Sequence, residues 1–258
     1  MSRHGGSGQS RASATYSFDL QDFKDIPTGA LTHLYFSFGY ISPGTFDLVP
    51  MDDLSPDLFS QFTDVKKSNP GLKTVIALGG WTFNDNGTAT QPVFSDMVST
   101  AANRALFIKK LFAFMRQYAF DGVDFDWEYP GATDRGGKPE DGKNFVTFLK
   151  ELNEENDKQL MHYVVSFTVP TSFWYLRHFD LKAVDYVDFV NVMSYDLHGV
   201  SQAISLPPAS SFVCIGNLDI ELKRQHDFEE LLSSQASWWL VKVSDAAIIC
   251  IIISLSKL

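Results

Sequence analysis

The chain has 258 residues, of which 21 are Lys or Arg and 31 are Asp or Glu, so its net charge is −10. A composition of 45% apolar and 20% charged residues is that of a globular protein and excludes wholesale disorder. The acidic balance argues against a nucleic-acid partner or an anionic membrane, because both need clustered Lys and Arg. The spacing of Cys214 and Cys250 matches no metal-ligand pattern, and we expect neither a metal nor another cofactor.

Strands and helices are predicted to alternate along the chain after a flexible tail at residues 1–20, which is rich in Gly, Ser, Arg and Ala at its start. Short apolar runs rich in aromatic and β-branched residues predict strands, and apolar stripes at helical spacing predict helices. The predicted strands are 31–39, 73–78, 122–127, 162–169 and 187–193, and the predicted helices lie around 54–65, 107–118 and 145–152. This order predicts an α/β protein with a buried parallel sheet.

The composition changes abruptly near residue 200. Of the 22 Phe residues, 20 precede that point, so residues 200–258 are expected to be an unrelated C-terminal tail. Our hypothesis is that this tail is translated intron, because Val200-Ser201 is what the common splice donor GTAAGT encodes in frame; sequencing the transcript across codon 200 tests it. Within the tail, the apolar run 246–253 predicts a strand or a disordered end, since a membrane span needs about 20 residues.

The strongest chemical signal is the segment DGVDFDWEYP, in which Asp124, Asp126 and Glu128 alternate with Phe125 and Trp127. On a strand, the three carboxylates share one face and the two aromatic rings share the other. Burying neighbouring carboxylates is costly, and at least one of them should hold a proton near neutral pH. A protonated carboxyl group at the end of a buried strand is a candidate general acid.

The segment has two other interpretations. A cation-binding loop would use oxygens at alternate positions, but Tyr129 stands where such a loop needs Gly. A solvated acidic edge is disfavoured by Phe125 and Trp127, which need a core to pack against. The acid–base interpretation is therefore preferred.

The same segment matches the D-x-x-D-x-D-x-E signature of the family 18 glycoside hydrolases, the chitinases. Residues 31–39, 73–81 and 188–199 resemble the second, third and sixth strands of that family, in order. Residues 131–142 most resemble its fungal, killer-toxin-like subgroup, and the resemblance covers residues 21–199 as a partial catalytic barrel.

The resemblance implies a (β/α)8 TIM barrel with its active site at the carboxyl ends of the strands. The barrel is expected to be incomplete, with strands 2 to 6 recognisable and strands 1, 7 and 8 not. It implies a retaining hydrolase of β-1,4-linked N-acetylglucosamine polymers that works by substrate-assisted catalysis. The implied partner is chitin or a chitooligosaccharide, with no nucleic acid and no membrane. The family location is extracellular or in the cell wall, although residues 1–10 do not resemble a secretory signal.

The resemblance also implies roles for individual residues. Glu128 is the general acid, Asp126 holds the substrate acetamide and shares a proton with Glu128, and Asp124 tunes that sharing. Tyr195 is implied to donate a hydrogen bond to the acetamide oxygen, whereas Asp121 is expected to be structural. The candidate substrate-binding residues are Trp81, Tyr129, Met193, Asp196, Tyr35 and Phe36. Each of the aromatic candidates is also open to a role in the core.

Three departures from the family leave the function of this chain open. Ala77 occupies a position where the family has Ser, no first strand is visible before Tyr16, and Trp238 and Trp239 lie in the wrong context for the tryptophan of the eighth strand. The alternatives are a working chitinase, a non-catalytic chitin-binding lectin-like relative, and an inactive fragment. Because lectin-like relatives usually lose the acid, the intact Glu128 counts against the second alternative.

Overall fold

The computed structural model describes residues 23, 26, 28–51 and 54–193, together with the strand backbones at 216–217, 240–242 and 248–252. The tail expected at residues 1–20 and most of the region 200–258 lie outside the described residues. In the part of the chain that is described, no helix has the length and apolar character needed to cross a membrane.

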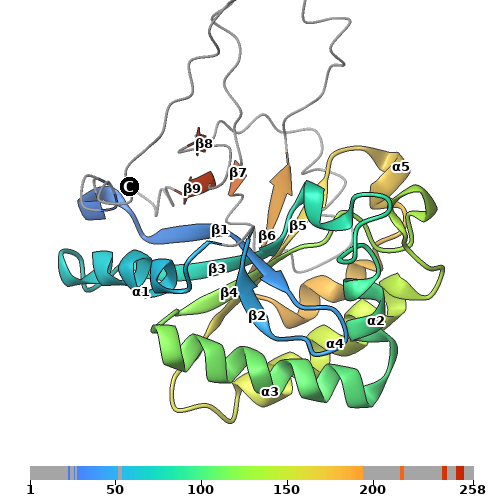
Figure 1. Cartoon of the computed structure of the whole chain (residues 1–258), viewed down its shortest axis with the longest axis horizontal. Coiled ribbons are helices and arrows are strands. Elements are labelled where there is room, and N and C mark those ends of the chain that lie inside the picture. The colour runs from blue at the N-terminus through green and yellow to red at the C-terminus, as the bar shows by residue number, and fades with distance from the viewer. Residues whose placement is uncertain are drawn as a thin grey trace, which may run out of the picture.

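A parallel sheet forms the centre of the molecule (Figure 1). Its five parallel strands are β1 (His33–Ile41), β3 (Lys73–Gly79), β4 (Gly122–Asp126), β5 (Val164–Pro170) and β6 (Phe189–Met193). They lie side by side in the order β1-β3-β4-β5-β6, and they are the five strands predicted from the sequence. The predicted α/β class and the partial barrel are therefore confirmed.

Short antiparallel strands pair with both outer members of this parallel set. At one side, β1 pairs with β2 (Leu48–Pro50) and with β9 (Ile248–Ile252), and β9 pairs in turn with β8 (Leu240–Lys242). At the other side, β6 pairs with β7 (Gly216–Asn217). Within the range 246–253, the described residues Ile248–Ile252 form a strand, which is one of the two structures expected there.

Helices cover one side of the parallel strands, with α2, α3 and α4 next to one another in Figure 1. The helices are α1 (Asp57–Thr63), α2 (Val93–Ser99), α3 (Ala101–Tyr118), α4 (Asp141–Asn156) and α5 (Phe173–Leu176). The short 3-10 helices are η2 (Thr28–Ala30), η3 (Asp64–Lys67), η4 (Trp81–Asn84), η5 (Thr133–Arg135) and η6 (Leu181–Tyr186). The three predicted helices correspond to α1 with η3, α3 and α4, whereas α2 and α5 were not predicted.

Helix α3 shows how the local sequence sets these elements. The side chain of Thr100 accepts a hydrogen bond of 3.1 Å from the backbone N–H of Asn103, which caps the first turn. The helix ends where Ala119 takes a left-handed conformation with φ of 56°. Its inner stripe includes Phe107 and Leu111, both fully buried, so burial of this face against the sheet supplies most of its stability.

The amino end of β4 is fixed by Asp121. Its Oδ2 accepts hydrogen bonds from the backbone N–H of Thr74 at 2.8 Å and from the Thr74 hydroxyl at 3.0 Å. Lys66 pairs with the same carboxylate at 2.7 Å. The expected structural role of Asp121 is confirmed, and β4 is held in register with β3 before its opposite end presents the acidic residues.

Candidate functional site

The acidic row lies at the carboxyl end of β4. Asp124, Asp126 and Glu128 are only 3%, 6% and 6% exposed. Phe125 and Trp127 lie on the opposite face among the helices, with exposures of 0% and 2%. The predicted division of the two faces is therefore confirmed, and both faces are almost free of water contact.

Polar side chains from the neighbouring strands contact the two aspartates. The Ser166 hydroxyl of β5 donates to Asp124 Oδ1 at 2.6 Å, and the Asn191 amide of β6 donates to the same oxygen at 2.9 Å. The Thr168 hydroxyl, two residues along β5, donates to Asp126 Oδ1. Alternation along β5 thus places one hydroxyl opposite each aspartate.

Burial changes the acidity of both aspartates. Loss of hydration, together with the nearby charge of Asp126, raises the pKa of Asp124 to about 7, while hydrogen bonds from Ser166 and Asn191 act in the opposite direction. Loss of hydration also raises the pKa of Asp126 to about 6, against the hydrogen bond from Thr168. The pair therefore holds a proton near neutral pH, as the sequence predicted, and can exchange it with a neighbour.

The β3 side of the row differs from the β5 side. Ala77 is the register partner of Asp124 on β3, and Ser37 of β1 is in turn the partner of Ala77. The hydroxyl that contacts Asp124 therefore comes from Ser166, across the opposite edge of β4. The loosened proton network expected from Ala77 stays a prediction.

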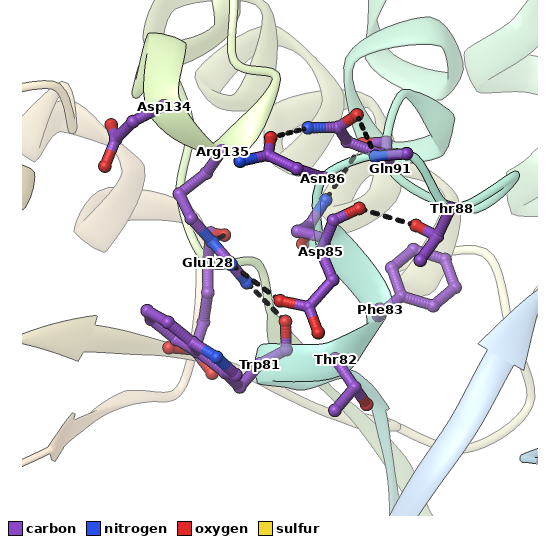
Figure 2. A network of polar contacts seen from close by, with 12 residues as sticks. Trp81, Thr82, Phe83, Asp85, Asn86, Thr88, Gln91, Glu128, Asp134 and Arg135 are labelled. Atoms are coloured by element: carbon purple, nitrogen blue, oxygen red, sulfur yellow. Dashed lines mark hydrogen bonds and ion pairs between the residues drawn. The ribbon is translucent and has the colours of Figure 1, made fainter.

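Arg135 connects the segment after β4 to the segment after β3 (Figure 2). Its Nε donates to the carbonyl oxygen of Glu128 at 3.2 Å, and its Nη1 pairs with Asp85 Oδ1 at 2.8 Å. Its Nη2 donates to the carbonyl oxygen of Trp81, and its guanidinium lies 3.8 Å from the centre of the Trp81 ring. The backbone at Glu128 and the indole of Trp81 are thus held by one buried side chain.

Asp134, the residue before Arg135, contacts the segment that follows β5, and in Figure 2 its carboxylate points away from the Arg135 side chain. Its Oδ2 accepts a hydrogen bond of 2.9 Å from the hydroxyl of Tyr175 on α5. The Tyr175 ring stacks on Tyr129 with their centres 4.3 Å apart. Adjacent residues of η5 therefore join the segments that follow β3, β4 and β5.

The predicted substrate-binding residues occupy different environments. Trp81 is 51% exposed at the carboxyl end of β3, as a sugar platform requires. Tyr129 is buried against Tyr175, and Met193 is buried at the end of β6, where its carbonyl accepts a 3.4 Å hydrogen bond from Thr171. Their contact with a substrate stays a prediction.

The expectation for Phe36 is wrong. Its ring is buried on the helix-covered face of β1, where it packs against Phe59 and Phe62 with centres 5.2 and 5.3 Å apart. Strand alternation places Tyr35 on the other face of β1, buried in a small cluster with Val75. Its contact with a substrate stays a prediction. The two other candidates, Tyr195 and Asp196, lie outside the described residues.

Sequence reasoning missed four residues of the site: Ser166, Thr168, Asn191 and Arg135. Three of them are polar residues inside predicted buried strands, and Ser166 and Thr168 are two positions apart and therefore share a face. A polar residue in a buried strand needs a partner, so this signal was present. Arg135 gave no such signal, because a loop arginine is ordinarily solvated.

Comparison with known proteins gives concordant results. The sequence model described as "Glycosyl hydrolases family 18" matches residues 5–253. The chain is 36% identical over 185 residues to a probable chitinase, LysM18, of Penicillium expansum, and this match covers 69% of the chain and 12% of that protein. It is 35% identical over 186 residues to the killer toxin subunits alpha/beta of Kluyveromyces lactis, covering 69% and 15%.

Solved structures agree with this result. A chitinase-like agglutinin from Robinia pseudoacacia has a TM-score of 0.59 and 30% identity, over 70% of this chain and 53% of that one. A mutant family 18 chitinase from Cycas revoluta, solved in complex with (GlcNAc)4, has a TM-score of 0.57 and 28% identity, over 69% and 52%. The chain thus spans about half the length of these solved proteins.

Proposed function

The chain belongs to the family 18 glycosyl hydrolases, and we propose that it is a chitinase-type hydrolase that cleaves β-1,4-linked N-acetylglucosamine polymers with retention. The observation that carries this proposal is the buried row of Asp124, Asp126 and Glu128, with its hydroxyl and amide donors. Placement in the fungal, killer-toxin-like subgroup, supported by the relatives in two fungi, is part of the same proposal, as is an extracellular or cell-wall location.

In the first step, Glu128 gives its proton to the glycosidic oxygen as the bond between that oxygen and the anomeric carbon breaks. The electron pair of this bond stays with the leaving oxygen. The oxygen of the substrate's own N-acetyl group attacks the anomeric carbon, so the protein needs no carboxylate nucleophile. Water then attacks the anomeric carbon of the cyclic intermediate from the opposite side and gives a proton to the Glu128 carboxylate. The bond between this carbon and the acetamide oxygen breaks, its electron pair returns to the acetamide, and two inversions give retention.

The two aspartates stabilise the charge that develops during this step. We assign to Asp126 the orientation of the acetamide N–H, which acquires positive character as the ring closes. A buried carboxylate at that point stabilises the developing charge more strongly than water would. Asp124, whose pKa is raised to about 7, can hold the proton that would otherwise neutralise Asp126. The substrate is placed by Trp81 on one side, and Met193, Tyr195 and Asp196 complete the sugar site in this proposal.

The decisive experiment is hydrolysis of a fluorogenic N-acetylglucosamine oligomer by the 258-residue chain. Glu128→Gln keeps the side-chain shape and removes the transferable proton, so it should lower turnover by about 10²–10⁴. Glu154→Gln is the matched control, because Glu154 is exposed on α4 and pairs only loosely with Lys150 at 3.9 Å. Turnover by Glu128→Gln equal to that of the control would remove Glu128 from the mechanism.

Tyr195 is tested separately. Tyr195→Phe should lower kcat/KM by the equivalent of about 2–4 kcal/mol, because it removes a donor aimed at the acetamide oxygen as charge builds there. An oligomer of glucosamine, which lacks the acetyl group, should not be turned over by either form. Equal rates for the Tyr and Phe forms would exclude this donor.

A non-catalytic, lectin-like function is the second candidate. It is favoured by the similarity to the Robinia agglutinin, whose printed description is chitinase-like. Calorimetric titration with tetra-N-acetylchitotetraose distinguishes the two. Binding without any turnover above the Glu128→Gln level supports the lectin-like function, whereas binding with turnover supports the hydrolase.

A further inference from the structure

Three aromatic rings are exposed among the described residues, and all three follow the carboxyl end of a strand. Trp81 in η4 follows β3, while Phe173 and Trp174 in α5 follow β5, with exposures of 51%, 76% and 58%. Strands β3 and β5 flank β4 in the sheet. Because the strands are parallel, the exposed rings lie at the same edge of the sheet as Glu128 and on either side of it.

The two tryptophans are held in the same way. The guanidinium of Arg135 lies 3.8 Å from the centre of the Trp81 ring, and that of Arg177 lies 3.8 Å from the centre of the Trp174 ring. Each indole therefore has one face covered by an arginine, yet more than half of its surface is accessible. The indole face opposite the arginine is therefore the one available to a ligand. The arginine also restricts the rotamers of the tryptophan side chain, so a ligand loses less free energy in ordering it.

Helix α5 is firmly attached to the segment that carries Glu128. Tyr175 stacks on Tyr129, the residue after Glu128, and its hydroxyl bonds to Asp134. The backbone also approaches closely, since a Cβ on Gly142 would lie 2.4 Å from the carbonyl oxygen of His178. The position of Trp174 relative to the acidic row is therefore fixed by packing.

We propose that Trp174, backed by Arg177 and flanked by Phe173, is a second saccharide platform on the β5 side of Glu128. It would stack on the C–H face of N-acetylglucosamine units that lie beyond those held near Trp81. The inference rests on the proposed function, because it takes the same polymer as ligand. Continuity with the acidic row through Tyr175 and Tyr129 is what favours a sugar chain as the occupant.

The test compares a short and a long ligand on the full chain. Di-N-acetylchitobiose and hexa-N-acetylchitohexaose are titrated by calorimetry into the chain carrying Glu128→Gln, with and without Trp174→Ala. We expect Trp174→Ala to weaken hexamer binding about three- to tenfold and to leave dimer binding unchanged, since aromatic stacking contributes about 0.5–1.5 kcal/mol. Trp174→Phe should retain most of the hexamer affinity that Trp174→Ala loses. Arg177→Met should cause a loss of hexamer affinity smaller than that of Trp174→Ala.

The matched control is Leu160→Ala, because Leu160 is a fully exposed apolar residue between α4 and β5, at the opposite edge of the sheet. Hexamer affinity unchanged by Trp174→Ala, or reduced equally for both ligands, overturns the platform. Absence of hexamer binding by the chain with Trp174 intact overturns it as well. A length-dependent loss in a chain that shows no hydrolysis with Glu128 intact supports the platform and overturns only the hydrolase assignment.

Discussion

The two faces of β4 are equally dry and have opposite effects on stability. Phe125 and Trp127 point into the helix-covered core, while Asp124 and Asp126 point to the other side, and all four are at most 6% exposed. Burial of the rings contributes about 1.5–3 kcal/mol each. Burial of the carboxylates costs free energy, which is seen in their raised pKa values. One strand thus combines a stabilising face with a face that is retained for its chemistry.

The largest expected effect comes from breaking the stabilising face. Trp127 stacks on Phe94 with ring centres 5.3 Å apart and meets Phe145 edge-on at 5.6 Å. Trp127→Ala should therefore lower the free energy of unfolding by about 3–5 kcal/mol, measured by urea denaturation. Trp81→Ala is the control, because Trp81 is half exposed. A loss below about 1 kcal/mol would contradict the assignment of this face to the core.

Removing a carboxylate charge from the other face of β4 should stabilise the fold. Asp124→Asn is expected to raise the free energy of unfolding by about 1–3 kcal/mol at pH 7.5. The folded-state pKa of Asp124, about 7, lies above the unfolded value of about 3.9. Its contribution to stability is therefore fully present below about pH 4 and is lost as the pH rises through 7. The gain from Asn should shrink toward zero at pH 4.

The difference between variant and parent isolates the buried pair of Asp124 and Asp126, because the titration of carboxylates that do not interact with this pair cancels. Asp185→Asn, at an exposed position of η6, is the matched control for the substitution itself. A destabilising Asp124→Asn at pH 7.5 would show that the ionised carboxylate, with its bonds from Ser166 and Asn191, stabilises the fold after all.

Thr168→Val sharpens the comparison by removing one donor and preserving volume. The Thr168 hydroxyl bonds to Asp126 and opposes the effect of burial on its pKa. The substitution should raise the pKa of Asp126 further and cost about 1–2 kcal/mol at pH 7.5, less at pH 4.5, where the carboxyl group is protonated. Thr147→Val, at an exposed position of α4, is the control. A cost independent of pH would indicate a purely packing effect.

Sequence reasoning found β4 because periodicity and chemistry coincide there. From Val123 to Glu128, apolar and acidic residues alternate. It placed Phe36 wrongly, because a ring near a strand end fits a sugar site and a core equally well until the register is known. Helix α2 was missed because its stretch VFSDMVS is too short for a convincing helical stripe. The Arg135 contacts depend on how the segments after β3 and β4 meet in space, which no local pattern encodes.

The smallest expected effect concerns Ala77, where the β3 side of the acidic row lacks the family's hydroxyl. Ala77 is buried and is the register partner of Asp124, so a serine there would direct its hydroxyl at the same face. Ala77→Ser should add a donor to Asp124, lower its pKa and stabilise the chain by about 0.5–1 kcal/mol at pH 7.5 and by less at pH 4. Ala105→Ser on α3 controls for the substitution itself. Destabilisation at both pH values would mean that the space beside Asp124 is already filled and that Ser166, from the opposite strand, has taken over the role of the missing hydroxyl.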